Sequence, residues 1–438
     1  MTRLTPLALL SPLALSLALI GQAQAQSLVE LYESARGYDA AYLGARALAQ
    51  SAGHKAAQSD ALKRPSASLT AGHTQTEADT PIGRRDTTAT QVLVNARYSL
   101  FNRVNDRTLA QAAKSLDAAR ADVDVAEQDL ILRVTQTYFD VLAAQDTLET
   151  TRASKTAITE QLASAKRNFE VGTATITDSR EAQARFDLAT ATEIAADNDL
   201  RTKRIALDQL VGRVNVTPKR LAQPVALPVL LPANVDTWVT QAENQHPLVR
   251  KAQVGLDIAS LEIERAKAGH LPSVDLIGNL GSTHSTGSAI LVKGTTTSAS
   301  IGVQLTMPLY SGNAIESRVK ETLSLREKSM NDLDVSRRGV AQLTRQAFFG
   351  VLSGQAQVKA LEAAEGSSKL ALEATQLGYR VGVRVNLDVL NAQTQLFQTQ
   401  RDLAKARYDV LVGGLRLRLA SGQLSGSDLQ VVNTLLAK

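Results

Sequence analysis

The chain of 438 residues contains no cysteine, which excludes disulfide bonds and metal sites built on thiolates. Aromatic residues make up only 4%, and the 48 basic and 43 acidic residues are mixed along the chain without a dense basic cluster. This composition argues against a nucleic-acid partner, since such surfaces gather Lys, Arg and aromatic side chains.

Motifs for catalysis are missing as well. The sequence has no H-E-x-x-H, no Walker loop and no nucleophile elbow. Its five histidines are scattered singly at His54, His73, His246, His270 and His284. We therefore expect a protein that is not an enzyme and that has no catalytic residues, no cofactor and no metal.

Long apolar runs are absent except at the N-terminus. Arg3 precedes an apolar stretch at residues 4–20, and small residues follow up to Ala25. This pattern predicts a secretory signal peptide over residues 1–25, cleaved after Ala25. Beyond it, no stretch approaches the roughly 18 uncharged apolar residues of a membrane-spanning helix. The mature chain should be soluble in the periplasm or cross a membrane as strands.

Proline is confined to a few places, which leaves long tracts free to be helical. None occurs between Pro81 and Pro218 or after Pro308. Because proline and glycine are the main helix breakers, we predict long helices at residues 105–170 and 314–380. At 1.5 Å per residue, each would be on the order of 100 Å long, and a seven-residue apolar spacing predicts packing against neighbouring helices. Shorter helical tracts are expected at 28–63, 176–211, 235–268 and 387–419.

The sequence repeats one plan twice. Residues 35–65 match residues 242–272 without a gap, and the offset drifts only from 207 to 210 along the copy. We expect a first copy at 26–222 and a second at 235–432, each with a helix, two strands, a long helix, a tip turn and a helix. A proline-rich linker at 223–234 joins them, and a C-terminal tail follows at 433–438.

Two strands are predicted in each copy. Val94, Ala96 and Tyr98 alternate with polar residues before Phe101, and Ile301 begins a similar alternation in the second copy. Strands of about ten residues with one apolar face suit an outer membrane. Four strands cannot close a barrel, because single-chain barrels begin at about eight and unpaired edges are costly in lipid. Several chains should therefore pool their strands, in a number that this pattern leaves open.

Four segments resemble the TolC family of outer-membrane efflux and secretion channels. They are FEVGTATITD at 169–178, GHLPSVDL at 269–276, LYSGN at 309–313 and GYRVGVRVNLDVL at 378–390. The resemblance covers essentially the whole mature chain. It implies a mainly α-helical fold with a membrane β-barrel, in which a homotrimer forms a 12-stranded barrel in outer-membrane lipid and a long α-helical barrel through the periplasm.

The resemblance also implies the role and the partners. The protein would be a passive exit duct that meets a periplasmic membrane-fusion adaptor and an inner-membrane pump of the ABC or RND type. Type I protein secretion and multidrug efflux stay open, as does the cargo. A periplasmic coiled-coil adaptor without a barrel is the alternative. It would explain the long helices and the signal peptide but not four amphipathic strands.

Two glycines interrupt the helical tracts at equivalent places, where a reversing turn needs a residue without a Cβ penalty. By the resemblance, the turns Val171-Gly172 and Val381-Gly382 are the tips that dock to the adaptor.

The resemblance further implies a gate near the tips. Tyr379 and Arg384 would bond to Thr177 and Asp178, as a latch that holds the tunnel shut. An entrance ring of two aspartates would follow. Asp388 matches the first position, but Asn391 stands at the second and halves the expected negative charge.

Overall fold

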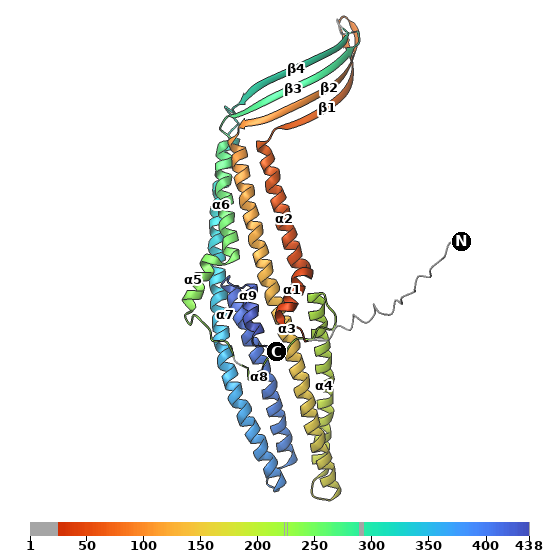
Figure 1. Ribbon diagram of the computed structural model, residues 1–438, viewed down its shortest axis with the longest axis vertical. Coiled ribbons are helices and arrows are strands. Elements are labelled where there is room, and N and C mark those ends of the chain that lie inside the picture. Colours follow the sequence, from red (N-terminus) through yellow and green to blue (C-terminus); the bar gives the residue numbers. More distant parts are fainter. Residues whose placement is uncertain (1–24, 223, 226, 289–292, 438) are drawn as a thin grey trace, which may run out of the picture.

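The computed structural model describes residues 25–222, 224–225, 227–288 and 293–437. The predicted signal peptide lies outside the described residues except for Ala25, so its cleavage stays a prediction. The described chain is a long rod in which helices run nearly parallel to one axis and a single sheet lies at one end (Figure 1).

The helices and strands follow one order twice. The first series is α1 (Leu28–Tyr38), α2 (Ala40–Asp60), β1 (Ser66–Thr80), β2 (Gly83–Phe101), α3 (Arg103–Glu170) and α4 (Ile176–Val211). The second is α5 (Val235–Gln245), α6 (Pro247–Ala268), β3 (Ser273–Thr286), β4 (Gly294–Thr306), α7 (Ala314–Arg380) and α8 (Asn386–Ala420). A short 3₁₀ turn (Ala61–Lys63) follows α2, and α9 (Gly426–Asn433) ends the chain.

The long helices match the prediction closely. α3 has 68 residues and α7 has 67, so each is about 100 Å long at 1.5 Å per residue. The other helices stack end to end beside them. α2 and α6 lie along the half nearer the sheet, and α4 and α8 along the far half, as Figure 1 shows.

The two tracts predicted as continuous helices at 28–63 and 235–268 are each broken near the middle of the rod. Asp39 is extended, and its side chain accepts a hydrogen bond from the backbone N–H of Tyr42. In the second series His246 is extended before Pro247, whose ring disfavours a helical conformation in the preceding residue. Each break starts a new helix, and Asp39 and His246 act as its N-cap.

The break at Asp39 is fixed to the neighbouring long helix. Arg133 of α3 donates from both Nη atoms to the two carboxylate oxygens of Asp39, at 2.9 and 3.1 Å. The hydrogen bonds from Arg133 lower the pKa of Asp39 below its usual range. The corresponding cap, His246, is buried, and burial lowers the pKa of its imidazole. The two breaks thus share a backbone shape but not their chemistry.

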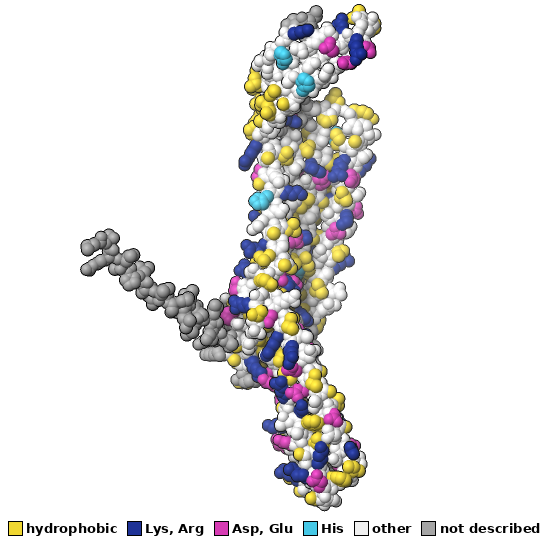
Figure 2. Space-filling view, turned by 90° about the vertical axis from the view of Figure 1, so that its right-hand side faces the viewer, with side chains coloured by type: hydrophobic (Ala, Val, Ile, Leu, Met, Phe, Trp, Pro, Cys, Tyr) yellow, Lys and Arg dark blue, Asp and Glu magenta, His cyan; other side chains and the backbone are white. Residues whose placement is uncertain are grey.

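The sheet is antiparallel with the order β1-β2-β3-β4. In its register Val94 faces Leu69 on one side and Leu280 on the other, and Leu280 faces Ala299. These side chains share one face because residues directly opposite each other on neighbouring strands point to the same side of the sheet. Figure 2 shows hydrophobic side chains gathered on the part of the sheet nearest the helices. β1 and β4 are the edge strands, each with one neighbour within the described chain.

The main hydrophobic core lies in a belt around the middle of the rod. Tyr138 and Phe139 of α3 are buried and meet edge to face, and Phe139 stacks on Tyr408 of α8. α1 and α9 pack into the same cluster. Each such side chain contributes on the order of 2 kcal/mol by leaving water, so the belt is where the two series are joined most firmly.

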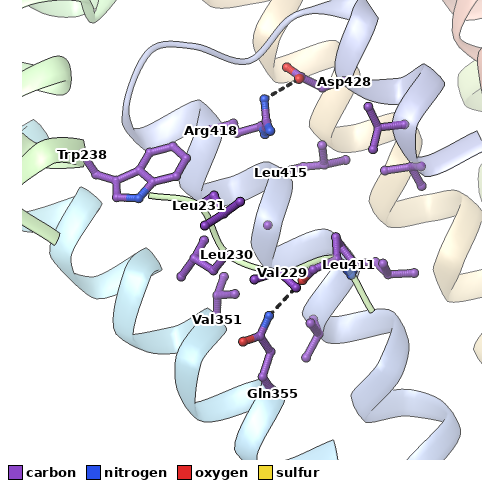
Figure 3. Close-up of a pocket in the computed structure, with 15 residues that line it drawn as sticks. Val229, Leu230, Leu231, Trp238, Val351, Gln355, Leu411, Leu415, Arg418 and Asp428 are labelled. Carbon is purple, nitrogen blue, oxygen red and sulfur yellow. Dashed lines mark hydrogen bonds and ion pairs between the residues drawn. The ribbon is translucent and has the colours of Figure 1, made fainter. Parts of the chain in front are cut away.

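The proline-rich linker is part of this belt. Gln355 of α7 donates to the carbonyl of Pro228 at 3.1 Å, and Trp238 donates its indole N–H to the carbonyl of Pro232 at 2.8 Å. Figure 3 shows Leu230 and Leu231 between these two contacts, lining a cavity of about 90 Å³ with side chains of α7 and α8. The cavity is small and largely apolar, in keeping with packing rather than ligand binding.

Among the described helices, none combines the length and the apolar character that a bilayer-spanning helix requires.

Candidate functional site at the helical tips

The two tip turns have the same backbone hydrogen bonds. In the first, the N–H of Gly172 donates to the carbonyl of Phe169 at 3.0 Å, and in the second Gly382 donates to Tyr379 at 3.1 Å. Both glycines are left-handed, with φ of 78° and 81°, which explains why glycine stands at each reversal. The two copies therefore share the same turn geometry, as their glycines predicted.

The apolar residues before these glycines point into solvent. The exposed fraction of the residue is 72% for Val171 and 65% for Val381. A Cβ added at either glycine would meet no atom within 4 Å, so both turns lie open at the end of the rod. Exposed apolar tips of this kind are suited to contact with another protein.

The first turn closes its outgoing helix with side chains. Thr175 accepts a hydrogen bond from the N–H of Asp178 at 3.2 Å, and Asp178 accepts one from the N–H of Thr175 at 3.0 Å. The Thr175 hydroxyl also donates to Asp178 at 2.8 Å. This capping box satisfies two backbone donors at the start of α4 and engages Asp178 with its own helix.

The second turn has no side-chain cap. Val385 stands where the first turn has Thr175, and it offers no acceptor to α8. The carboxylate that matches Asp178 is Asp388, which pairs with Arg384 at 3.7 Å. The stem of Arg384 crosses Gly378, where a Cβ would lie 2.8 Å from its Cγ. Gly378 therefore allows Arg384 to fold back over the turn.

A direct contact joins the ends of α3 and α7. Asn168 donates from Nδ2 to the hydroxyl of Tyr379 at 3.1 Å. The Asn168 carbonyl also accepts from Thr173 and Ala174, so this residue both closes the first turn and holds the tyrosine of the second. Nearby, Gln161 of α3 donates to the buried Asn386 at the start of α8.

The four predicted latch residues lie at the same end of the rod without being bonded to one another. Thr177 is exposed, Asp178 caps α4, Tyr379 is bonded to Asn168 and Arg384 to Asp388. Within the described part of one chain, no hydrogen bond or ion pair joins Tyr379 or Arg384 to Thr177 or Asp178. The latch stays a prediction that would involve a change of partner or a second copy of the chain.

The predicted entrance ring lies one turn further along α8. Asp388 is half-buried, whereas Asn391 is exposed and accepts a hydrogen bond from Arg185 of α4 at 3.0 Å. A cation of α4 therefore already contacts the position where the resemblance expects a carboxylate. In the described residues, no group of three or more His, Cys, Asp or Glu side chains could hold a metal ion.

Asn168, Gly378 and Arg185 were missed by the sequence reasoning. Gly378 was visible in the motif as a second glycine before the turn, but its role depends on how the stem of Arg384 folds back across the turn, which the motif alone does not show. Asn168 and Arg185 act on residues that are 211 and 206 positions away, so no local pattern could identify them.

The chain is similar to known proteins over most of its length. A family model described as outer membrane efflux protein matches residues 31–213 and 238–423. The outer membrane protein TolC of Vibrio cholerae serotype O1 is 32% identical over 418 residues, which cover 93% of each chain. The alkaline protease secretion protein AprF of Pseudomonas aeruginosa is 33% identical over 339 residues, 76% of this chain and 69% of the relative.

The fold is similar to solved structures as well. The outer membrane protein VceC from Vibrio cholerae superimposes with a TM-score of 0.76 at 19% identity, covering 90% of this chain and 96% of the other.

Proposed function

This chain belongs to the outer membrane efflux protein family, and from that premise we propose that three copies form a passive exit duct for a tripartite export system. The observation that supports this most is a four-stranded sheet with an apolar face and two unpaired edges, at the end of helices about 100 Å long.

The number of chains follows from closure and resemblance together. In lipid, each unpaired backbone group costs several kcal/mol, so the edges of β1 and β4 must be paired by further copies. Four strands from each of three chains give a 12-stranded barrel, which lies within the range of outer-membrane barrels. The helices of the three chains then continue the barrel as a periplasmic tunnel.

The partners would meet the tunnel at the open tips. Val171 and Val381 offer exposed apolar contacts beside the glycine turns, and we assign them to a periplasmic membrane-fusion adaptor. An inner-membrane pump, of the ABC or RND type, would supply the energy. The cargo is not encoded at the tips, but relatives named for alkaline protease secretion and for solvent efflux support both classes of export.

The decisive experiment compares assembly and conductance. The mature protein, extracted from the outer-membrane fraction, should have the mass of a trimer and give discrete current steps in planar lipid bilayers. A matched variant with Val94→Asp and Leu280→Asp, which places charges on the apolar face of the sheet, should lose insertion. A protein that is monomeric and leaves the bilayer silent would refute the duct and favour a periplasmic adaptor.

A further inference from the structure

A row of alternating histidine and threonine crosses the sheet at one level. In the strand register His73 of β1 faces Thr90 of β2, Thr90 faces His284 of β3, and His284 faces Thr295 of β4. All four side chains lie at the surface of the sheet. They share a face with Val94 and Leu280 because they lie an even number of residues away along the same strands. The row therefore belongs to the apolar face of the sheet.

The row forms two pairs of the same kind. The Nδ1 atom of His73 lies 2.8 Å from the hydroxyl of Thr90, and that of His284 lies 3.0 Å from the hydroxyl of Thr295. The two histidines are 211 positions apart and the two threonines 205, so the pairs do not occupy equivalent places in the repeat. The register of the sheet, rather than the repeat, brings both pairs to one level.

The row lies at the outer limit of the apolar face. Two rows nearer the helices, all four side chains are apolar: Leu69, Val94, Leu280 and Ala299. The row between is half apolar, with Ala71 and Val92 beside Ser282 and Thr297. Away from the helices the next rows are polar and then charged, ending in the ion pair of Arg84 with Glu77. The apolar character of the face therefore declines over one row and has ended at the histidines.

The position fits a membrane boundary. Phe101 and Tyr98 mark the inner end of the apolar face and are 42% and 38% exposed, as an aromatic girdle would be. From Phe101 to Thr90 is 11 residues, about 36 Å along the strand, and a tilt of about 40° reduces this to roughly 27 Å of height. The apolar band of outer-membrane barrels is about 25 Å tall, so the row lies where an outer aromatic girdle would otherwise lie.

The second ring nitrogen of each histidine, Nε2, has no hydrogen-bond partner among the described residues. A histidine whose Nδ1 is engaged by a threonine hydroxyl keeps Nε2 for another partner. When the hydroxyl donates to Nδ1, Nε2 carries the proton and is a donor, and in the imidazolium form both nitrogens are donors. The ring itself is amphipathic, with an apolar body and a polar tip. At the boundary of a lipid layer, the acceptors that meet such a tip are headgroup phosphates.

A metal site is a poorer interpretation of the same residues. His73 and His284 are separated by one strand, so they lie about 10 Å apart at roughly 4.8 Å per strand. In the part of the chain that the structure describes, no third His, Cys, Asp or Glu side chain joins them in a group that could hold a metal ion, and structural zinc sites use four ligands.

We propose that the row of His73, Thr90, His284 and Thr295 is the outer-leaflet contact line of this protein, where the histidines donate hydrogen bonds to phosphate groups of lipid headgroups. The inference rests on the proposed placement of the sheet in the outer membrane. The inference goes further because it names the residues that set the depth of the sheet in the membrane and the chemical group of the lipid that they bind.

The test measures lipid retained by the folded protein. Wild type and variants are inserted into phosphatidylcholine vesicles that carry lipid A or its fully dephosphorylated form, extracted into mild detergent, and assayed for lipid A per chain after gel filtration. Wild type should retain about threefold or more of the phosphorylated over the dephosphorylated lipid, because charge-assisted hydrogen bonds are the stronger ones. The paired change His73→Phe with His284→Phe keeps an aromatic ring but no donor, and it should abolish the preference.

Two further variants separate a donor effect from a folding effect. His73→Gln with His284→Gln keeps a side-chain N–H, so most of the preference should remain. His54→Ala removes an exposed histidine of α2, away from the sheet, and should change nothing. A wild type without preference, or Phe variants that keep it, would overturn the contact line while leaving the duct intact. Failure of wild type to float with vesicles would instead refute the placement of the sheet, and the contact line with it.

Discussion

The two tip turns have one backbone and two kinds of side-chain chemistry. Both reverse the chain at a left-handed glycine and close with the same set of backbone hydrogen bonds. The first turn engages its carboxylate, Asp178, in capping α4, whereas the second leaves α8 uncapped and pairs Asp388 with Arg384. The difference indicates that the first turn is fixed by local contacts, while the side chains of the second can exchange partners. In the predicted gate, the first turn would be the fixed part and the second turn the part that changes partners.

The largest effect should come from removing the side-chain contacts of the second turn. Tyr379→Phe with Arg384→Ser removes the hydrogen bond to Asn168 and the ion pair with Asp388. If these residues form the latch, two exposed contacts worth together about 1–2 kcal/mol are lost, which shifts the balance between closed and open by roughly tenfold. We expect a higher single-channel conductance in planar bilayers.

The matched control for the latch is Arg380→Ser, which removes an arginine of the same turn that is not a proposed latch residue. Its conductance should equal that of wild type. If the Tyr379→Phe, Arg384→Ser variant also has the conductance of wild type, that result would count against a latch at this turn.

The next effect concerns the capping box. Asp178→Asn removes the carboxylate that accepts from the backbone and hydroxyl of Thr175. Thr175 remains the N-cap, but the charge-assisted bonds from Thr175 and the interaction of the carboxylate with the N-terminus of α4 are lost. Together these cost about 1 kcal/mol, so amide hydrogen exchange in the first turn of α4 should accelerate about fivefold.

Asp388→Asn is the control for that comparison, because no side-chain cap is made at the start of α8. Its effect on exchange in the first turn of α8 should be clearly smaller. Equal acceleration at the two turns would mean that the capping box does not distinguish them.

The turns and the long helices could be predicted from the sequence because both depend on local rules. Gly172 and Gly382 tolerate φ near 80° without the strain that a side chain would add, and the absence of proline allowed α7 to be placed at residues 314–380. The break before Pro247 also had a local signal, because proline disfavours a helical conformation in the residue before it. The break at Asp39 had only a weak one, since aspartate is a common N-cap but also a common surface residue.

The contacts that distinguish the tips could not be predicted in this way. Asn168 reaches Tyr379 because α3 and α7 end side by side, and Arg185 reaches Asn391 because α4 and α8 do. Such partners depend on how helices far apart in sequence pack. The resemblance supplied four latch residues, but it could not indicate which partners they have in a single chain.

A smaller effect is expected at the predicted entrance ring, where Glu181 of the first copy stands at the position of Asn391 in the second. Asn391→Asp would place a carboxylate next to Arg185, which now donates to the amide. Part of the new charge would be neutralised by that arginine. We therefore expect the half-blocking concentration, at which a trivalent cation halves the single-channel current, to fall only about threefold. Salt in the solution also screens the new charge.

Combining Asn391→Asp with Arg185→Gln tests that reasoning, because the new carboxylate then loses its cationic neighbour. The half-blocking concentration should fall further than with Asn391→Asp alone. An unchanged concentration in both variants would show that position 391 does not face the path of the ions.

The smallest and most specific effect should come from giving the second turn the cap of the first. In Val385→Thr the new hydroxyl can accept from the N–H of Asp388, as Thr175 does from Asp178. The gain should be about 0.5 kcal/mol, a slowing of amide exchange at the start of α8 by about twofold, because the N–H of Asp388 already donates to the carbonyl of Val385. The reciprocal bond of a capping box would in addition require the Asp388 carboxylate to leave Arg384. Val385→Ala is the control, with no acceptor and no slowing. If threonine slows exchange and also frees Arg384, the variant should close more firmly, since the arginine is then available to the latch. If exchange slows and conductance is unchanged, the pairing of Arg384 with Asp388 does not compete with the latch.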